Sequence, residues 1–126
     1  MKRFFRVRRT LAPALLLIFA AIGCREYRSF WVNVTVVNQT SAPIREIEVD
    51  YPNASFGINA LAPGAVYHYR LKVSGSGKIR AQYAGAMDKT IRVDGPMLKD
   101  NLQGQIRIAL LPNNSIVFSE DLSLGQ

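Results

Sequence analysis

Apolar and polar side chains alternate along most of the chain from Phe30 onward. The first run places an apolar residue at every second position from Phe30 to Val36, the period of a β-strand with one buried face. The same alternation predicts further strands, over residues 46–51, 55–59, 66–73, 78–83, 90–93, 106–110 and 116–118. No segment shows a helical period. We therefore expect an all-β fold, an antiparallel sandwich of about seven or eight strands.

Two stretches of the same region lack this alternation. Residues 94–104 contain Gly, Pro and several polar residues, and we expect them to form the longest connection. Residues 119–126 are mostly polar and are expected to form a tail beyond the last strand. Residues 30–126 as a whole are the predicted sandwich domain, a natural size for one hydrophobic core.

Residues 61–67 read Leu-Ala-Pro-Gly-Ala-Val-Tyr. Pro63 and Gly64 suit the central positions of a type II turn, because Pro presets φ and Gly accepts a positive φ. The spacing Leu-x-Pro-Gly-x-x-Tyr resembles the tyrosine corner of fibronectin type III and related sandwiches. That resemblance implies an immunoglobulin-like architecture and a hydrogen bond from the Tyr67 hydroxyl to the turn. In fibronectin type III one further strand follows the strand of this corner, whereas three or four follow here, so the topology stays open.

The first 23 residues have the pattern of a secretory signal peptide. Five basic residues lie within residues 2–9, and an apolar run follows over residues 11–22. As a helix that run would be about 18 Å long. This is short for a bilayer core of about 30 Å. We expect the basic residues to stay on the cytoplasmic side while the apolar run enters the membrane.

The leader ends in Ala21-Ile22-Gly23-Cys24, which resembles the lipobox of bacterial lipoproteins. The resemblance implies cleavage between Gly23 and Cys24, a diacylglycerol on the Cys24 thiol, and acylation of the new amino terminus. Residues 24–29 would then be the lipidated cysteine and a short tether. Arg25 follows the cysteine, where an acidic residue favours the inner membrane in that family, so the periplasmic face of the outer membrane is expected. The alternative is a secreted, unanchored protein with a stray cysteine.

The leader also explains most of the positive charge. The chain carries 16 Lys and Arg against nine Asp and Glu, a net charge of +7. Without residues 1–23, 11 basic and nine acidic residues remain, a net charge of +2. No basic stripe is left, which argues against nucleic acid as a partner. The single cysteine leaves no intramolecular disulfide.

Candidate chemistry is sparse in the sequence. His68 is the only histidine, and it alternates with inward-facing residues beside Arg70, so we expect it to be solvated on an outer face. A catalytic triad needs a nucleophile next to its base, and a zinc site needs several His or Cys ligands. The sequence nominates neither, so we predict no metal, no cofactor and no enzymatic activity. A small secreted hydrolase is the alternative from another class.

Successive strands run between opposite ends of a sandwich, so alternate connections should share an end. If the anchor precedes the first strand, the connections at 38–43, 60–64, 84–88 and 112–115 point away from the membrane. Loops of sandwiches often carry the function. The candidate partner contacts in these connections are Asn38, Gln39, Met87, Asp88, Asn113 and Asn114. The alternative is that they are ordinary polar turns.

Together these features predict a lipid-anchored protein of the cell envelope with a binding or scaffolding module. Its partners would be the membrane, through Cys24, and a protein or cell-wall glycan. The alternative within this class is an accessory lipoprotein of an envelope assembly or secretion complex.

Overall fold

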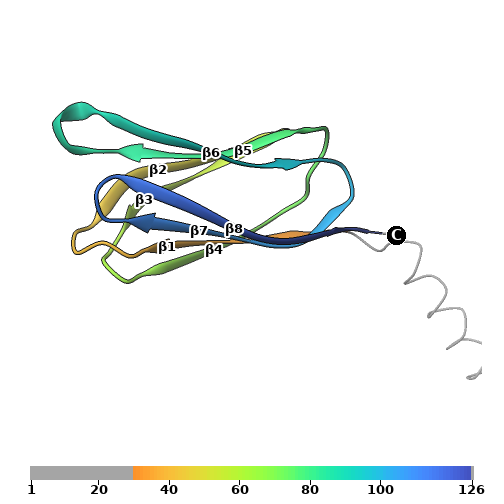
Figure 1. Cartoon of the computed structure of the whole chain (residues 1–126), viewed down its shortest axis with the longest axis horizontal. Helices are drawn as coiled ribbons and strands as arrows, with labels where there is room; N and C mark the ends of the chain where they lie inside the picture. The colour runs from red at the N-terminus through yellow and green to blue at the C-terminus, as the bar shows by residue number, and fades with distance from the viewer. Residues whose placement is uncertain (1–29, 126) are drawn as a thin grey trace, which may run out of the picture.

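The structure, a computed structural model, describes residues 30–125, and these form eight strands (Figure 1). The predicted signal peptide, the cleavage site at Gly23 and the lipidation site at Cys24 lie outside the described residues. The strands are β1 (Val32–Asn38), β2 (Ile44–Tyr51), β3 (Ala54–Leu61), β4 (Val66–Leu71), β5 (Gly77–Ala84), β6 (Thr90–Leu98), β7 (Leu102–Leu111) and β8 (Ser115–Leu124). A short 3-10 turn, η1 (Ala86–Asp88), joins β5 to β6.

The strands form two four-stranded sheets that lie as two layers (Figure 1). The first sheet has the order β4-β1-β7-β8, and the second has the order β3-β2-β5-β6. The expectation of an all-β sandwich with seven or eight strands is therefore confirmed. The expectation of a fully antiparallel fold is wrong at one pair. Strands β1 and β7 run parallel. Successive strands alternate in direction, so the odd-numbered strands all run the same way, and β7 lies next to β1 in the first sheet.

Alternating side chains of both sheets fill the space between the layers. In β1 the inward set is Val32, Val34 and Val36, all at most 1% exposed, as the alternation predicts. Ile106, Ile108 and Leu110 of β7 lie beside them, and Ile79 and Ala81 of β5 face them from the other sheet. This burial of branched apolar side chains is the main stabilising contribution in a domain without a disulfide.

Aromatic side chains close the two long edges of the sandwich. At one edge Phe56 of β3 stacks on Tyr69 of β4, with ring centroids 4.1 Å apart. At the other edge β6 packs against β8. There Gly95 lies so close to Phe118 and Ile79 that an added Cβ would meet their side chains at 2.7 and 2.8 Å. A glycine is therefore needed at this position for β6 to reach the core.

The predicted long connection over residues 94–104 is wrong. Strand β6 continues through it to Leu98, and β7 already begins at Leu102. Pro96 does not end β6, because β6 is an edge strand and one side of its backbone needs no ladder partner. The register shift between Lys78 and Arg80 of β5 accommodates the irregular part of the pair.

The predicted polar tail over residues 119–126 is also wrong. Strand β8 pairs with β7 without interruption, from Ser115 opposite Leu111 to Leu124 opposite Leu102. The sequence conceals this strand because Glu120 occupies an inward position at an exposed edge, which breaks the apolar alternation. Leu122 resumes it and packs against the core.

Strand β2 contains a bulge that sets its side-chain alternation. Ile44 and Ile47 are both buried although they are three positions apart. Glu46 between them has φ +54, and the pairing with β5 shifts between Arg45 and Glu48. One extra residue therefore lets two isoleucines face the same core.

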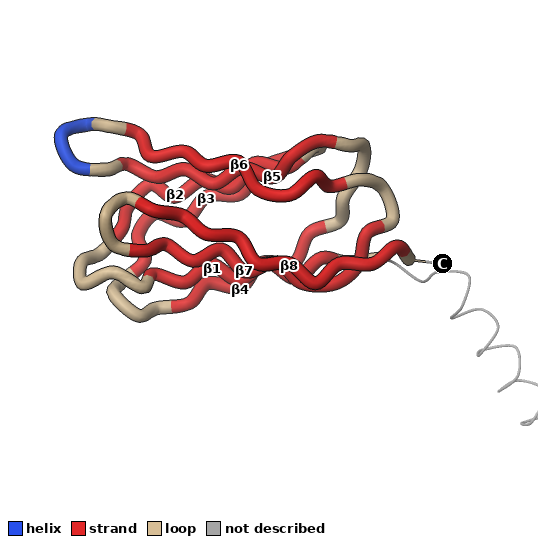
Figure 2. The backbone as a smooth tube through the Cα atoms, in the orientation of Figure 1, coloured by secondary structure: helices blue, strands red, loops and turns tan. Residues whose placement is uncertain are grey.

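The eight strands give the molecule two distinct ends (Figure 2). The loop end carries the connections 39–43, 62–65, 85–89 and 112–114. The opposite end, here the terminal end, holds the start of β1, the end of β8 and the connections 52–53, 72–76 and 99–101. The alternation of connections between ends is thus as the sequence predicts.

The turn at residues 61–67 has the predicted backbone but a different tyrosine contact. Gly64 has φ +75, and the Ala65 N–H donates to the Ala62 carbonyl over 3.0 Å, as in a type II turn. The expected hydrogen bond from Tyr67 to this turn is not among the side-chain hydrogen bonds of residues 30–125. The Tyr67 ring instead stacks on Phe56, with centroids 6.2 Å apart.

Candidate functional site

Three of the four connections at the loop end enclose a shallow groove with a volume of about 450 Å³. We call it the loop-end groove. The connections 39–43, 85–89 and 112–114 supply most of its lining. The full lining is Thr40, Ser41, Ala42, Pro43, Ile44, Tyr83, Gly85, Ala86, Leu111, Pro112, Asn113 and Asn114.

Asn38 organises the loops at this end from inside the protein. Its side chain is fully buried, and its amide nitrogen donates to the carbonyl oxygens of Ala42 and Leu61, each over 2.9 Å. Its amide oxygen accepts from the Thr40 backbone N–H over 2.9 Å and from the Thr40 hydroxyl over 2.6 Å. The side chain thus uses both donors and both acceptor positions of an amide.

The expectation that Asn38 contacts a partner is therefore wrong. A side chain with no exposed surface and no free hydrogen-bonding capacity cannot meet another molecule. Its backbone reaches the neighbouring connection as well, since the Gly64 N–H donates to the Asn38 carbonyl over 2.7 Å. Asn38 instead links the connection 39–43, which lines the groove, to the connection 62–65 by hydrogen bonds.

Asn113 and Asn114 are the predicted contacts that the structure brings into the groove. Both are exposed, and their φ angles are +65 and +59. Asparagine tolerates this left-handed region better than most residues. The tight turn between β7 and β8 consequently presents two amide side chains next to Pro112.

The other predicted contacts lie outside the groove. Met87 and Asp88 occupy η1 at the tip of the β5–β6 connection, and Met87 is 93% exposed. Gln39 is exposed, and its backbone N–H donates to the Leu110 carbonyl over 2.8 Å. These three residues share the loop end with the groove but do not line it.

The lining of the groove has a distinctive chemistry. Its side chains are apolar, hydroxyl or amide groups, and none carries a formal charge. Tyr83 forms part of the wall and is 5% exposed. Burial raises the pKa of the Tyr83 hydroxyl above its ordinary value. Such a surface suits an uncharged, partly apolar segment that also offers hydrogen-bond groups.

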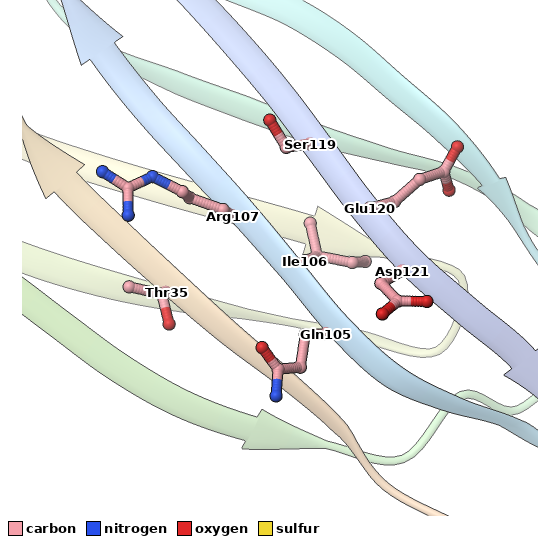
Figure 3. A pocket seen from close by; sticks show the side chains of 7 residues that line it. All are labelled: Thr35, Gln105, Ile106, Arg107, Ser119, Glu120 and Asp121. Carbon is pink, nitrogen blue, oxygen red and sulfur yellow. The ribbon is translucent and has the colours of Figure 1, made fainter.

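A second, polar surface lies on the outer face of the first sheet, on the part away from the loop end. Two hollows adjoin there, with volumes of about 260 and 540 Å³, and both are lined by Thr35 and Gln105. Figure 3 shows Gln105, Arg107 and Asp121 over the neighbouring strands β7 and β8. Most of these residues belong to the outward set of each strand, and no local sequence pattern distinguishes them from an ordinary solvated face.

The outer face also contains the residues next to the expected membrane tether. Arg70 stacks over the Trp31 ring, with the guanidinium carbon 4.3 Å from the ring centroid. His68 is exposed, as expected, and its Nδ1 lies 3.2 Å from the Thr35 hydroxyl oxygen. Trp31 is 36% exposed, so this pair forms a half-buried cation–π contact near the terminal end.

An ion pair lies on the outer face of the second sheet. The Arg80 Nε lies 2.8 Å from the Asp94 carboxylate, and both side chains are nearly half exposed. The hydrogen bond from Arg80 lowers the pKa of Asp94, and the same contact raises the pKa of Arg80. Exposed pairs of this kind contribute little to stability.

Residues 30–125 contain no group of three or more His, Cys, Asp or Glu side chains arranged to hold a metal ion. Within the same described range, no helix has the length and apolar character needed to cross a membrane.

Comparison with known proteins adds a distant structural likeness. No protein-family model and no curated protein matches the sequence. The NMR structure of a protein from Eubacterium rectale is similar to this chain, with a TM-score of 0.49 and 15% sequence identity. The similar region covers 71% of this chain and 87% of that chain.

Proposed function

We propose that this chain is a lipid-anchored protein of the cell envelope whose sandwich presents the loop-end groove to a partner. The main observation in support is that the terminal end and the loop-end groove lie at opposite ends of the sandwich. The chain enters β1 at the terminal end, and the connections that line the groove lie at the opposite end (Figure 1). An anchor at Cys24 would therefore hold the terminal end near lipid and leave the groove facing away.

The lipid anchor is proposed from the lipobox resemblance and the shortness of the tether. Six residues separate Cys24 from Phe30, a reach of at most about 20 Å when extended. The outer membrane is the proposed location, on its periplasmic face. In this arrangement Trp31 and Arg70 lie near the headgroups, where aromatic and basic side chains are favoured.

The partner we favour is a protein segment. The groove lining has no charged side chain, combines prolines with Ala42, Ile44 and Leu111, and offers the amides of Asn113 and Asn114. Such a lining can bury apolar surface and satisfy backbone hydrogen bonds at once. The role is binding or scaffolding without catalysis, as an accessory lipoprotein of an envelope assembly if the partner belongs to one. A cell-wall glycan is the other outcome of the test.

We also propose an immunoglobulin-like classification of the fold. The order β3-β2-β5-β6 corresponds to the C′-C-F-G sheet of variable-type domains, and the pair β4-β1 corresponds to strands E and B. Under this correspondence β7 takes the place of strand A of the immunoglobulin fold, but it pairs in parallel with β1, the strand B equivalent. Tyr67 then lies on the E strand, whereas a tyrosine corner belongs to strand F.

The anchor is tested by fractionating cells that express Cys24→Ser. We expect the variant to appear in the soluble fraction and to lack the mass of the acyl chains, while the parent stays with the membranes. Membrane retention of the variant would overturn the lipoprotein assignment.

The groove is tested by crosslinked capture from intact envelopes. Ala42→Arg places a long charged side chain in the groove and should abolish capture of the partner. Ala54→Arg is the matched control, because Ala54 is exposed at the start of β3, next to the opposite end. Asn113→Gly retains the positive φ and removes the amide, so it should weaken capture. Equal capture by all three variants would rule out the groove, and capture of glycan strands would identify the other partner.

A further inference from the structure

The outward side chains of the first sheet fall into rows that cross all four strands. One row, nearest the loop end, is entirely apolar. It consists of Val66, Val37, Ala109 and Val117, which are register partners in sequence across β4, β1, β7 and β8. Val66 and Val117 are each 47% exposed. Val37 is buried although it points outward and does not belong to the core cluster. We attribute its burial to its neighbours in the row.

The other rows are polar, and their charges are unevenly placed. Arg70, Asn33, Gln105 and Asp121 form one row by the same registers. His68, Thr35, Arg107 and Ser119 form the row between this one and the apolar row. The β4 edge is thus basic, with Arg70, and the β8 edge is acidic, with Asp121, while Arg107 on β7 faces Thr35 within its own row. Two strands separate these opposite charges, so they form no ion pair within one molecule.

We propose that this face binds a second copy of the chain, as a twofold symmetric dimer with the axis parallel to the strands. Such an axis lays β4 of one copy over β8 of the other and keeps every row at the same height. The apolar rows then cover each other. Arg70 faces Asp121 of the second copy, and the symmetric contact forms at the other edge. Two sheets packed this way keep their strands within about 30° of each other.

The alternative twofold axis, perpendicular to the strands, does not fit the same face. It would place β4 over β4 and β8 over β8, which brings Arg70 to the side of the second copy's basic edge. It would also lay the apolar row against a polar row. A symmetric interface must be self-complementary, and only the axis parallel to the strands makes this face so.

The proposed axis also places both terminal ends on the same side. If the proposed anchor at Cys24 is correct, both copies can then be held in one membrane, and this clause alone rests on the proposed function. Four strands make a face about 20 Å wide. Three rows about 7 Å apart make it about 20 Å long, an area of about 400 Å². Specific interfaces bury about 800 Å² per partner, so we expect a modest, micromolar affinity that tethering to one surface strengthens.

The test uses the full chain in detergent, with two differently tagged copies and measurement of mass and co-purification. The parent chain should form dimers at tens of micromolar. Arg70→Glu sets two carboxylates against each other at both edges of the interface, and Asp121→Arg sets two guanidinium groups against each other in the same places. Each variant alone should dimerise at least about tenfold more weakly. The two variants mixed should pair again, because both contacts become complementary.

This recovery on mixing separates the proposal from a folding defect. Loss of the Arg70–Trp31 contact would weaken one variant but would not be repaired by the other chain. Arg92→Glu, at an exposed position of the second sheet, is the matched control and should leave the dimer unchanged. A parent chain that stays monomeric, or folded single variants that do not recover on mixing, would overturn the proposal. Neither result bears on membrane release by Cys24→Ser.

Discussion

The side-chain amide nitrogen of Asn38 lies 2.9 Å from the carbonyl oxygen of Leu61, 23 residues further along the chain. This bond joins the end of β1 in the first sheet to the end of β3 in the second. The hydrogen bond is buried. Water therefore cannot replace the Asn38 amide as the partner of the Leu61 carbonyl. One polar side chain therefore links the two layers beside the groove, in addition to the apolar core.

Replacing Asn38 by Ala should lower the free energy of unfolding by about 3 kcal/mol, because it leaves buried backbone groups without partners. Asn53→Ala is the matched control. Asn53 also joins distant segments, through the Lys72 carbonyl and the Ser74 N–H, but these bonds are exposed to water. Its loss should cost less than about 1 kcal/mol. Urea unfolding of both variants measures the difference, and equal midpoints would contradict it.

Gly104→Ala should be strongly destabilising. Gly104 has φ +132, a region that side chains rarely adopt, and an added Cβ would collide with the Asp121 carbonyl oxygen of the adjacent strand. We expect a loss of about 3 kcal/mol or more. At Gly57 an added Cβ would meet the Ile47 carbonyl oxygen at an ordinary 3.7 Å, so Gly57→Ala should be nearly neutral. Thermal unfolding compares them, and a folded, stable Gly104→Ala would refute the expectation.

Tyr83→Phe should reduce the sensitivity of the fold to alkaline pH. Burial raises the pKa of Tyr83 in the folded state above the value of about 10 in the unfolded chain. The contribution of the protonated Tyr83 hydroxyl to stability is therefore complete below about pH 10, and it is lost as the pH rises through the pKa of Tyr83 in the folded protein. Melting temperatures between about pH 8 and 11 should fall less steeply for the variant. Parallel curves for the two proteins would be inconsistent with this origin.

Arg80→Gln should raise the pKa of Asp94 towards its ordinary value. The hydrogen bond from Arg80 keeps that pKa lowered, so the pair stabilises the fold above the unfolded pKa of about 4 and loses this effect as pH falls. An NMR titration of the Asp94 side chain measures the change directly. Because both groups are well exposed, the effect on unfolding should be small and should decrease with added salt.

The sequence predicts the buried strands well because their alternation is strong. Val32, Val34 and Val36 face the core as the period of two requires, and the turn at Pro63-Gly64 has the expected positive φ. Prediction fails at edge strands. There Pro96 in β6 and Glu120 in β8 are compatible with pairing, since one side of an edge strand faces water.

The loop end was predictable from strand alternation, but its groove was not. Asn38 and Asn113 look alike in sequence, as asparagines next to turns, yet one is fully buried and the other is exposed. The difference arises from Leu61, whose carbonyl reaches the Asn38 amide only after the two sheets have packed. The rows on the outer face likewise depend on the parallel register of β1 and β7, which no local pattern encodes.

The parallel pairing of β1 with β7 has a kinetic consequence. Val32 pairs with Gly104, so β1 finds its central neighbour only when most of the domain has been synthesised. Until then β1 is a run of valines without a partner on that side. Folds dominated by such distant pairings fold in about milliseconds to seconds. We expect refolding in that range, and a microsecond phase that accounts for the full amplitude in stopped-flow or temperature-jump experiments would contradict this. Exposed during that interval, β1 would be a segment prone to aggregate before the domain is complete.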